Sequence, residues 1–224
     1  MSMRKLGIKK RYRGHRSSGF SLVELMIVVA ITIVLSVVSV MSLVPMMNSQ
    51  RVTNAYNTTL AALRQARDNA VSQRTSYEVV FSQTTTTPVQ TTISVMPTIA
   101  GFTGDHSTVS YQYPIGVIFQ TPPTSSGTAP DGYGTGSAPI DFGYTSNGNA
   151  GGPTSYTIYF CPDGSAQTSS ACSGAGNWDG GVVYLARTGD VGSYRAVSLW
   201  GGTGRIHGWR LYSNGTGGYQ WVRQ

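Results

Sequence analysis

A long apolar run without charged residues lies near the start of the chain, between Leu25 and Val44. An α-helix rises about 1.5 Å per residue, so a helix of this length would extend about 30 Å, the thickness of the hydrocarbon core of a bilayer. The run is longer than the apolar part of an ordinary secretory signal, and no A-x-A cleavage pattern follows it. The pattern therefore predicts a membrane-spanning helix over residues 20–45.

Beyond Pro45 the apolar positions recur every three or four residues, which is the period of one face of a helix. They are Val52, Tyr56, Leu60, Leu63, Ala66 and Ala70, and polar or charged residues stand between them. We therefore expect the helix to continue to about Gln73, with residues 46–76 forming an amphipathic segment that packs on a soluble domain. Because proline removes a backbone hydrogen bond, we also expect a kink at Pro45, where the helix leaves the membrane.

After Ser76 the pattern changes to that of strands, with β-branched and aromatic residues between turn-forming clusters. The predicted strands are residues 77–82, 91–96, 116–120, 156–161, 180–187, 194–200 and 205–212. Residues 121–139 and 144–155 are rich in Gly, Pro, Ser and Thr, so we expect exposed, flexible loops within 121–155, which could also order on a partner. The predicted fold is α+β: a long N-terminal helix packed on a C-terminal antiparallel β-sheet domain, residues 77–224.

The excess positive charge is confined to the N-terminal segment. The chain has 16 Lys and Arg against 9 Asp and Glu, a net charge of +7. Seven of the cations and none of the acids precede Phe20, so the rest of the chain is balanced in charge. A basic segment before an apolar run is typical of an export or membrane-insertion signal, with the cations on the cytoplasmic side. The overall charge is therefore not an argument for nucleic-acid binding.

Glu24 is an acidic residue at the start of the apolar segment, in the stretch G-F-S-L-V-E-L that begins at Gly19. A carboxylate close to a membrane span is unfavourable unless it is compensated. Cleavage between Gly19 and Phe20 would create an α-amino group able to neutralise the Glu24 carboxylate of a neighbouring copy. This arrangement of residues resembles the class III signal of type IV pilins and pseudopilins.

The resemblance implies a set of roles for the N-terminal residues. A prepilin peptidase would remove a basic leader, residues 1–19, by cutting after Gly19, and would methylate the new N-terminal Phe20. Glu24 would serve assembly, and residues 20–45 would form the transmembrane helix and later the filament core. The resemblance further implies a single-pass protein of the bacterial inner membrane, with its C-terminal domain in the periplasm, that enters a filament after processing and contacts other major and minor pseudopilins or pilins.

The C-terminal part carries a second resemblance. The segments GGVVYLARTGD, RAVSLW and GTGRIHGWR, within residues 180–210, are similar to the end of the GspH/FimT family of minor pseudopilins and minor pilins. This resemblance implies a structural subunit that initiates or caps the periplasmic pseudopilus of a type II protein secretion system. The alternative is a FimT-like minor type IV pilin that primes the pilus or binds DNA during natural transformation.

The DNA alternative concerns the C-terminal turn, where relatives of the FimT kind are expected to carry Gly-Arg-x-Arg. Here the turn reads Gly204, Arg205, Ile206 and His207, with Arg210 and Arg223 further on. Histidine is mostly neutral near pH 7, so Arg205, His207 and Arg210 make a weaker cationic patch than the pattern requires. Ordinary surface arginines on a strand remain the alternative to a DNA contact, which would be steeply salt-dependent.

The remaining chemistry-bearing residues favour a structural protein. Cys161 and Cys172 are the only cysteines; in an exported chain they could form a disulfide, or they could be two free thiols. A bridge would close a loop of about 12 residues, a stabilisation of about 3 kcal/mol in the chain-entropy model. Two cysteines without a nearby histidine do not suggest a metal site. No hydrolase, metalloprotease or nucleotide-binding motif is present, so we expect neither a cofactor nor enzymatic activity.

Overall fold

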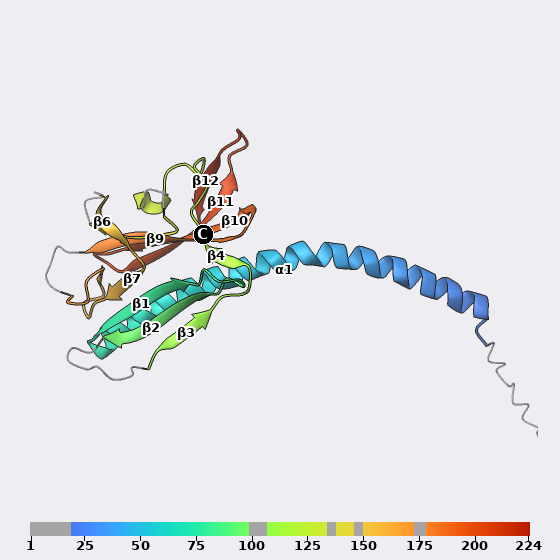
Figure 1. Ribbon diagram of the computed structural model, residues 1–224, viewed down its shortest axis with the longest axis horizontal. Helices are drawn as coiled ribbons and strands as arrows, with labels where there is room; N and C mark the ends of the chain where they lie inside the picture. Colours follow the sequence, from blue (N-terminus) through green and yellow to red (C-terminus); the bar gives the residue numbers. More distant parts are fainter. Residues whose placement is uncertain (1–18, 99–106, 134–137, 146–149, 173–177) are drawn as a thin grey trace, which may run out of the picture. The chain divides into compact units, whose positions relative to one another are not determined.

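The computed structural model describes residues 19–98, 107–133, 138–145, 150–172 and 178–224 (Figure 1). The chain divides into two compact units, Met1–Pro45 and Met46–Gln224. The predicted leader, residues 1–19, lies outside the described residues except for Gly19.

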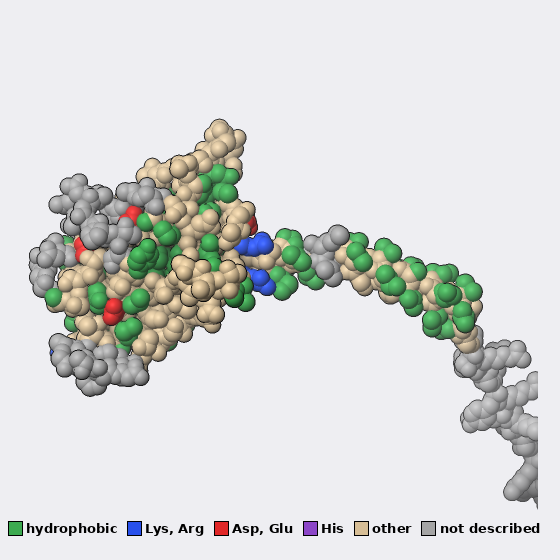
Figure 2. All heavy atoms as spheres, in the orientation of Figure 1, with side chains coloured by type: hydrophobic (Ala, Val, Ile, Leu, Met, Phe, Trp, Pro, Cys, Tyr) green, Lys and Arg blue, Asp and Glu red, His purple; other side chains and the backbone are tan. Residues whose placement is uncertain are grey.

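Helix α1 runs from Leu22 to Gln73, which confirms the predicted helix to its C-terminal end. Among the described residues it is the one helix long and apolar enough to cross a membrane, with a mean hydropathy of 2.8 over its most apolar window. Pro45 lies inside α1, and helical backbone continues on both sides of it. In the first unit the described large apolar side chains of α1 are exposed, and Figure 2 shows them along the helix.

Three hydroxyl groups in the apolar run are satisfied by the helix itself. Thr32 donates a hydrogen bond of 2.8 Å to the carbonyl of Val29, and Ser39 donates one of 2.9 Å to Leu35. Ser36 bonds in the same way to Thr32. Hydroxyls bonded back to the preceding turn need no water, so they are compatible with a hydrocarbon environment.

In the second unit, the predicted apolar face of α1 is buried. Val52, Leu63, Ala66 and Ala70 are fully buried, Tyr56 is 8% exposed, and Leu60 packs against the same core. Among the charged residues of this part of α1, Arg51, Arg64 and Asp68 are exposed. The buried face that the amphipathic pattern predicts for this part of α1 is thus confirmed.

The described residues of the second unit form two antiparallel sheets. The five-stranded sheet has the order β3-β2-β1-β7-β8. Its strands are β1 (Ser76–Gln83), β2 (Thr91–Thr98), β3 (Val109–Gln112), β7 (Thr157–Phe160) and β8 (Ala166–Gln167).

The seven-stranded sheet has the order β12-β11-β10-β9-β5-β6, and β4 pairs with β9 beside β5. Its strands are β4 (Val117–Phe119), β5 (Ile140–Thr145), β6 (Ala150–Ser155), β9 (Asp179–Arg187), β10 (Asp190–Trp200), β11 (Arg205–Ser213) and β12 (Tyr219–Arg223). All seven strands predicted from the sequence form, and β3, β5, β6, β8 and β12 are additional. The α+β prediction is confirmed, with two sheets in the soluble part.

One hydrophobic core joins α1 to both sheets. It includes Leu63 of α1, Phe81 of β1, Phe142 of β5 and Leu185 of β9. The rings of Phe81 and Phe142 lie 5.5 Å apart, so the two sheets meet directly at this point. Strand β9 is buried on both faces, because Val183 and Leu185 face this core while Val182 and Tyr184 face a second cluster.

The second cluster is covered by part of the segment predicted as flexible loops. Tyr133 is 7% exposed and packs on Val182, Tyr184 and Ala196, the outer face of the seven-stranded sheet. The short 3₁₀ turn η1 (Pro130–Gly132) lies just before it. The expectation of exposed loops is therefore wrong for these residues, because one aromatic side chain anchors an otherwise polar segment.

The same correction applies to β5. Ile140 and Phe142 are buried, and Asp141 between them is 5% exposed, since β5 adds to the edge of β9. Strand β6 pairs with β5 and continues the sheet through residues 150–155, which were also predicted as loop.

Cys161 and Cys172 form a disulfide, with their Cα atoms 5.6 Å apart. The bridge joins the end of β7 to the segment after β8. The sequence left open a disulfide or two free thiols, and the structure contains the disulfide.

Candidate anion-binding pocket

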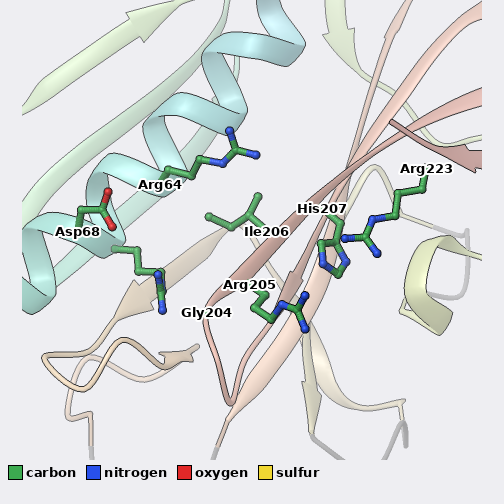
Figure 3. Close-up of a pocket in the computed structure, with 8 residues that line it drawn as sticks. Arg64, Asp68, Gly204, Arg205, Ile206, His207 and Arg223 are labelled. Carbon is green, nitrogen blue, oxygen red and sulfur yellow. The ribbon is translucent and has the colours of Figure 1, made fainter.

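A pocket of about 420 Å³ lies at the start of β11, within the second unit (Figure 3). We call it the arginine pocket. It is lined by Arg64, Arg67, Asp68, Gly204, Arg205, Ile206, His207 and Arg223. Two of the predicted DNA-contact residues, Arg205 and His207, are therefore brought together, and they are joined by three further arginines.

Strand pairing places three of the basic side chains on one face of the sheet. Alternate residues of a strand share a face, so Arg205, His207 and Trp209 point the same way along β11. Arg223 of β12 lies directly opposite Trp209 in the antiparallel register, and it therefore shares that face. Figure 3 shows Arg205, His207 and Arg223 extending from the strands, with Arg64 and Asp68 extending from α1.

The turn before Arg205 requires a glycine. Gly204 has a φ of +58°, in the left-handed region that favours glycine. A Cβ at this position would lie 2.7 Å from Nε of Arg67 and would also collide with the carbonyl oxygen of Gly164. Gly204 thus lets the β10–β11 turn approach α1 closely enough for Arg205 to join the pocket.

Arg67 holds this turn in place. Its Nε donates a hydrogen bond of 3.3 Å to the carbonyl of Gly164, and its Nη2 donates one of 3.1 Å to the carbonyl of Thr203. Gly164 belongs to the segment between β7 and β8, and Thr203 to the β10–β11 turn. Arg67 is therefore a positioning residue that joins α1 to two loops.

His207 is fixed by an acidic partner. Its Nδ1 lies 2.8 Å from Oδ2 of Asp131 in η1, and the pair forms a salt bridge when the ring is protonated. The hydroxyl of Ser198 also donates to Asp131 and accepts a hydrogen bond of 2.9 Å from Nε1 of Trp209. Burial alone would raise the pKa of Asp131, but hydrogen bonds from Ser198, His207 and Trp200 outweigh it and hold the pKa below its ordinary value.

Because Asp131 is ionised near neutral pH, Nδ1 of His207 donates the hydrogen bond to it. The other ring nitrogen, Nε2, is buried and has no hydrogen-bond partner among the described residues. Asp131 thus sets the orientation of the ring, in which Nδ1 has a hydrogen-bond partner and Nε2 has none among the described residues.

The pocket carries an excess of positive charge. Among the residues that the structure describes, no carboxylate lies within ion-pair distance of Arg64, Arg205 or Arg223. Asp68 is the one acidic residue of the lining. Several guanidinium groups at a shared pocket with a single carboxylate make an anion the ligand that fits best.

Arg210 does not belong to this group. It lies opposite Arg195 of β10, and residue alternation puts it on the other face of the sheet from Arg205 and His207. Its guanidinium group lies 4.9 Å from the ring centre of Tyr212. Burial first, and the charge of Arg210 second, lower the pKa of Arg195. The predicted set of Arg205, His207 and Arg210 is thus divided between two faces.

Sequence reasoning missed Arg64 and Arg67 as members of the site, and it noted Arg223 only as a further arginine beyond the turn. The helical pattern placed Arg64 and Arg67 off the apolar face of α1, but nothing in the local sequence indicates which turn they meet. Their proximity to Arg205 depends on tertiary packing between segments far apart in the chain.

The residues assigned to processing and assembly lie at the start of α1. Phe20 is 78% exposed, and Glu24 is exposed in the first turn of the helix. A Cβ at Gly19 would have no atom within 4 Å. A negative side chain in the first turn interacts favourably with the helix dipole.

A comparison with protein families matches residues 14–43 to the prokaryotic N-terminal methylation motif. The matched segment includes Gly19, Phe20 and Glu24. No curated protein and no solved structure matches the chain. The motif implies processing by a prepilin peptidase and assembly with other pilins, and together with the apolar part of α1 it supports anchoring in the inner membrane. The N-terminal methylation motif and the long helix therefore support a type IV pilin-like protein.

Proposed function

We propose that this chain is a minor pseudopilin, a structural subunit that initiates or caps the periplasmic pseudopilus of a type II protein secretion system. The observation that carries the proposal is the methylation motif over residues 14–43, followed directly by an apolar, exposed helical segment with Glu24 in its first turn. A soluble protein would not leave such a helix uncovered.

In this function, a prepilin peptidase hydrolyses the peptide bond between Gly19 and Phe20 and methylates the new amino group. The amine of one subunit then pairs with the Glu24 carboxylate of its neighbour, which compensates the charge of both groups in an apolar environment. The apolar residues up to Pro45 supply the helix packing of the filament core.

The resemblance to minor subunits is carried by β9, β10 and β11. Residues 180–210 form three adjacent strands of the seven-stranded sheet, with the Gly204–Arg205 turn between β10 and β11. A subunit at a filament tip uses such a soluble part to contact other subunits.

The first experiment is to replace Glu24 by Gln, which keeps the shape of the side chain and removes its charge. We expect the variant to be inserted and processed normally but to co-purify poorly with the other pilin-like subunits of the same cells. Replacing Gly19 by Trp should instead leave an uncleaved chain on a gel; the space around Gly19 means that a fold defect would not explain the result. Normal co-purification of Glu24→Gln would contradict the proposal.

A second candidate function is that of a minor type IV pilin that contacts DNA. The specific observation in its favour is that Arg205 and His207 share a pocket with Arg64 and Arg223. The test is a gel shift of the full-length chain in detergent micelles with duplex DNA, at low and at physiological salt. Arg205→Gln should weaken binding, and Arg210→Gln, on the opposite face, is the matched control. Equal effects of the two changes would count against this site.

A further inference from the structure

We propose that the arginine pocket binds the carboxylate side chains of an acidic segment on a partner protein. The proposal gives the soluble part of the chain a defined partner-binding surface. It rests on the proposed function in one respect, since a tip subunit must recognise neighbouring chains through residues outside the filament core.

Three cations of the pocket have no carboxylate partner among the described residues. Arg64, Arg205 and Arg223 are exposed, and among the described residues none of them is paired with a carboxylate. Like charges gathered at one pocket repel each other, and an anionic ligand relieves that repulsion. A guanidinium group can donate two parallel hydrogen bonds to one carboxylate. These bonds fix the orientation of the carboxylate in addition to the attraction between the charges.

The arginine pocket combines charged and apolar lining residues. A volume of about 420 Å³ is enough for a few side chains of a bound segment. Ile206 lines the same pocket and also packs against the hydrophobic core. A glutamate fits such a surface, because its methylene groups can contact Ile206 while its carboxylate meets the arginines.

The distribution of charge favours an acidic protein segment over DNA. Duplex DNA carries about one negative charge per 1.7 Å, and its binding depends on neutralising many phosphates along an extended surface. Residues 20–224 contain no lysine and as many acidic as basic residues, so the cations of the pocket are a local feature. Asp68 in the lining also disfavours a densely charged polyanion. These features favour a short segment with a few carboxylates.

His207 supplies a rigid wall for the ligand. Asp131 fixes the ring through Nδ1, which leaves Nε2 as its unpartnered polar atom among the described residues. Arg67 has a different part in the site, because its hydrogen bonds to Gly164 and Thr203 commit it to holding the turn. The ligand contacts are therefore assigned to Arg64, Arg205 and Arg223.

The test measures binding of the full-length chain, in detergent micelles, to a fluorescein-labelled peptide that alternates glutamate with leucine. The same peptide with glutamine in place of glutamate is the ligand control. We expect Arg64→Gln combined with Arg223→Gln to lower the affinity for the glutamate peptide by about tenfold or more. Arg51→Gln is the matched protein control, because Arg51 is also an exposed arginine of α1 but lies outside the pocket lining.

Equal binding of the glutamine peptide, or an unchanged affinity in the double variant, would overturn the proposal. Tighter binding of a labelled DNA duplex, lost in the same variant, would overturn it in favour of DNA. The peptide measurement requires neither processing nor filament assembly, because the whole lining lies in Met46–Gln224. Normal filament entry of Glu24→Gln would therefore refute the proposed function without affecting the peptide result.

Discussion

Asp131 and His207 connect the 3₁₀ turn η1 to strand β11 through a contact of 2.8 Å between Oδ2 and Nδ1. The two residues are 76 positions apart in the chain. Through this contact a turn that covers the outer face of the sheet also orients one wall of the arginine pocket. The position of η1 on the sheet and the geometry of the arginine pocket are therefore coupled.

Asp131→Asn tests the contribution of this carboxylate to stability. Asn tolerates the left-handed backbone found at Asp131, with φ of 53°, so the change removes mainly the charge. We expect the free energy of unfolding to fall by about 1–2 kcal/mol at pH 7, because partly buried hydrogen bonds to a charged group are weakened or lost. The four tryptophans all lie in the second unit, so their fluorescence during urea unfolding reports on it.

The difference in stability between the unmodified chain and Asp131→Asn should depend on pH. The folded-state pKa of Asp131 lies below its ordinary value of 3.8, so its stabilising contribution is present above that value. The contribution is lost as the pH falls through the folded-state pKa. The difference in stability between the unmodified chain and Asp131→Asn should therefore be large at pH 7 and shrink below pH 3.8. A difference that keeps growing as the pH falls below 3.8 would contradict this assignment.

Gly204→Ala tests the close approach of the β10–β11 turn to α1. We expect a loss of about 2 kcal/mol or more, because the added methyl group meets Arg67 and Gly164 and the backbone is left-handed. Gly189→Ala is the control, since Gly189 has a φ of +78° but no atom within 4 Å of an added Cβ. Gly189→Ala should cost only about 1 kcal/mol of conformational strain. Urea midpoints that agree between the two variants would show that the contacts around Gly204 matter little.

Gly208→Ala tests how α1 packs on β11. A Cβ on Gly208 would overlap the hydroxyl and the ring of Tyr56, so we expect a loss of about 1–3 kcal/mol. Tyr56→Phe removes the overlapping hydroxyl, and the double variant should lose less stability than the sum of the single changes. Strictly additive losses in the urea unfolding of the four proteins would exclude this contact as the cause.

Replacing both Cys161 and Cys172 by Ser tests the disulfide. Opening a loop of about 12 residues should lower the free energy of unfolding by about 3 kcal/mol, because the unfolded chain gains conformational freedom. Treating the unmodified chain with a reductant should produce the same shift in the urea midpoint. A reductant that shifts the double Ser variant equally would show that the effect does not come from this bridge.

The helix and the seven predicted strands could be found from the sequence because each has a regular period of its own. The spacing of residues such as Leu63 and Ala66 predicts a buried helix face, and the β-branched residues of β9 predict a strand. Strand β8 has only two residues, too few for a period to appear. Its presence depends on the neighbouring strand β7 that pairs with it.

The burial of Tyr133 and the arginine pocket could not be predicted from a local sequence period. Tyr133 is one aromatic residue in a polar stretch, and its burial follows from the open face of β9 and β10 that it meets. Arg67 and Thr203 are 136 residues apart, and no local pattern relates them. The sequence motif drew attention to Arg205 and His207, whereas the arginines that complete the pocket are specified by packing.

Strand β9 has a consequence for the dynamics of the soluble part. It is paired to β10 on one side and to β4 and β5 on the other, and both of its faces are covered. The amide protons of Val182, Val183 and Tyr184 can reach water only when several layers separate together. Their exchange with deuterium should therefore be among the slowest in the molecule and should follow global unfolding, which makes β9 the last part of the fold to open.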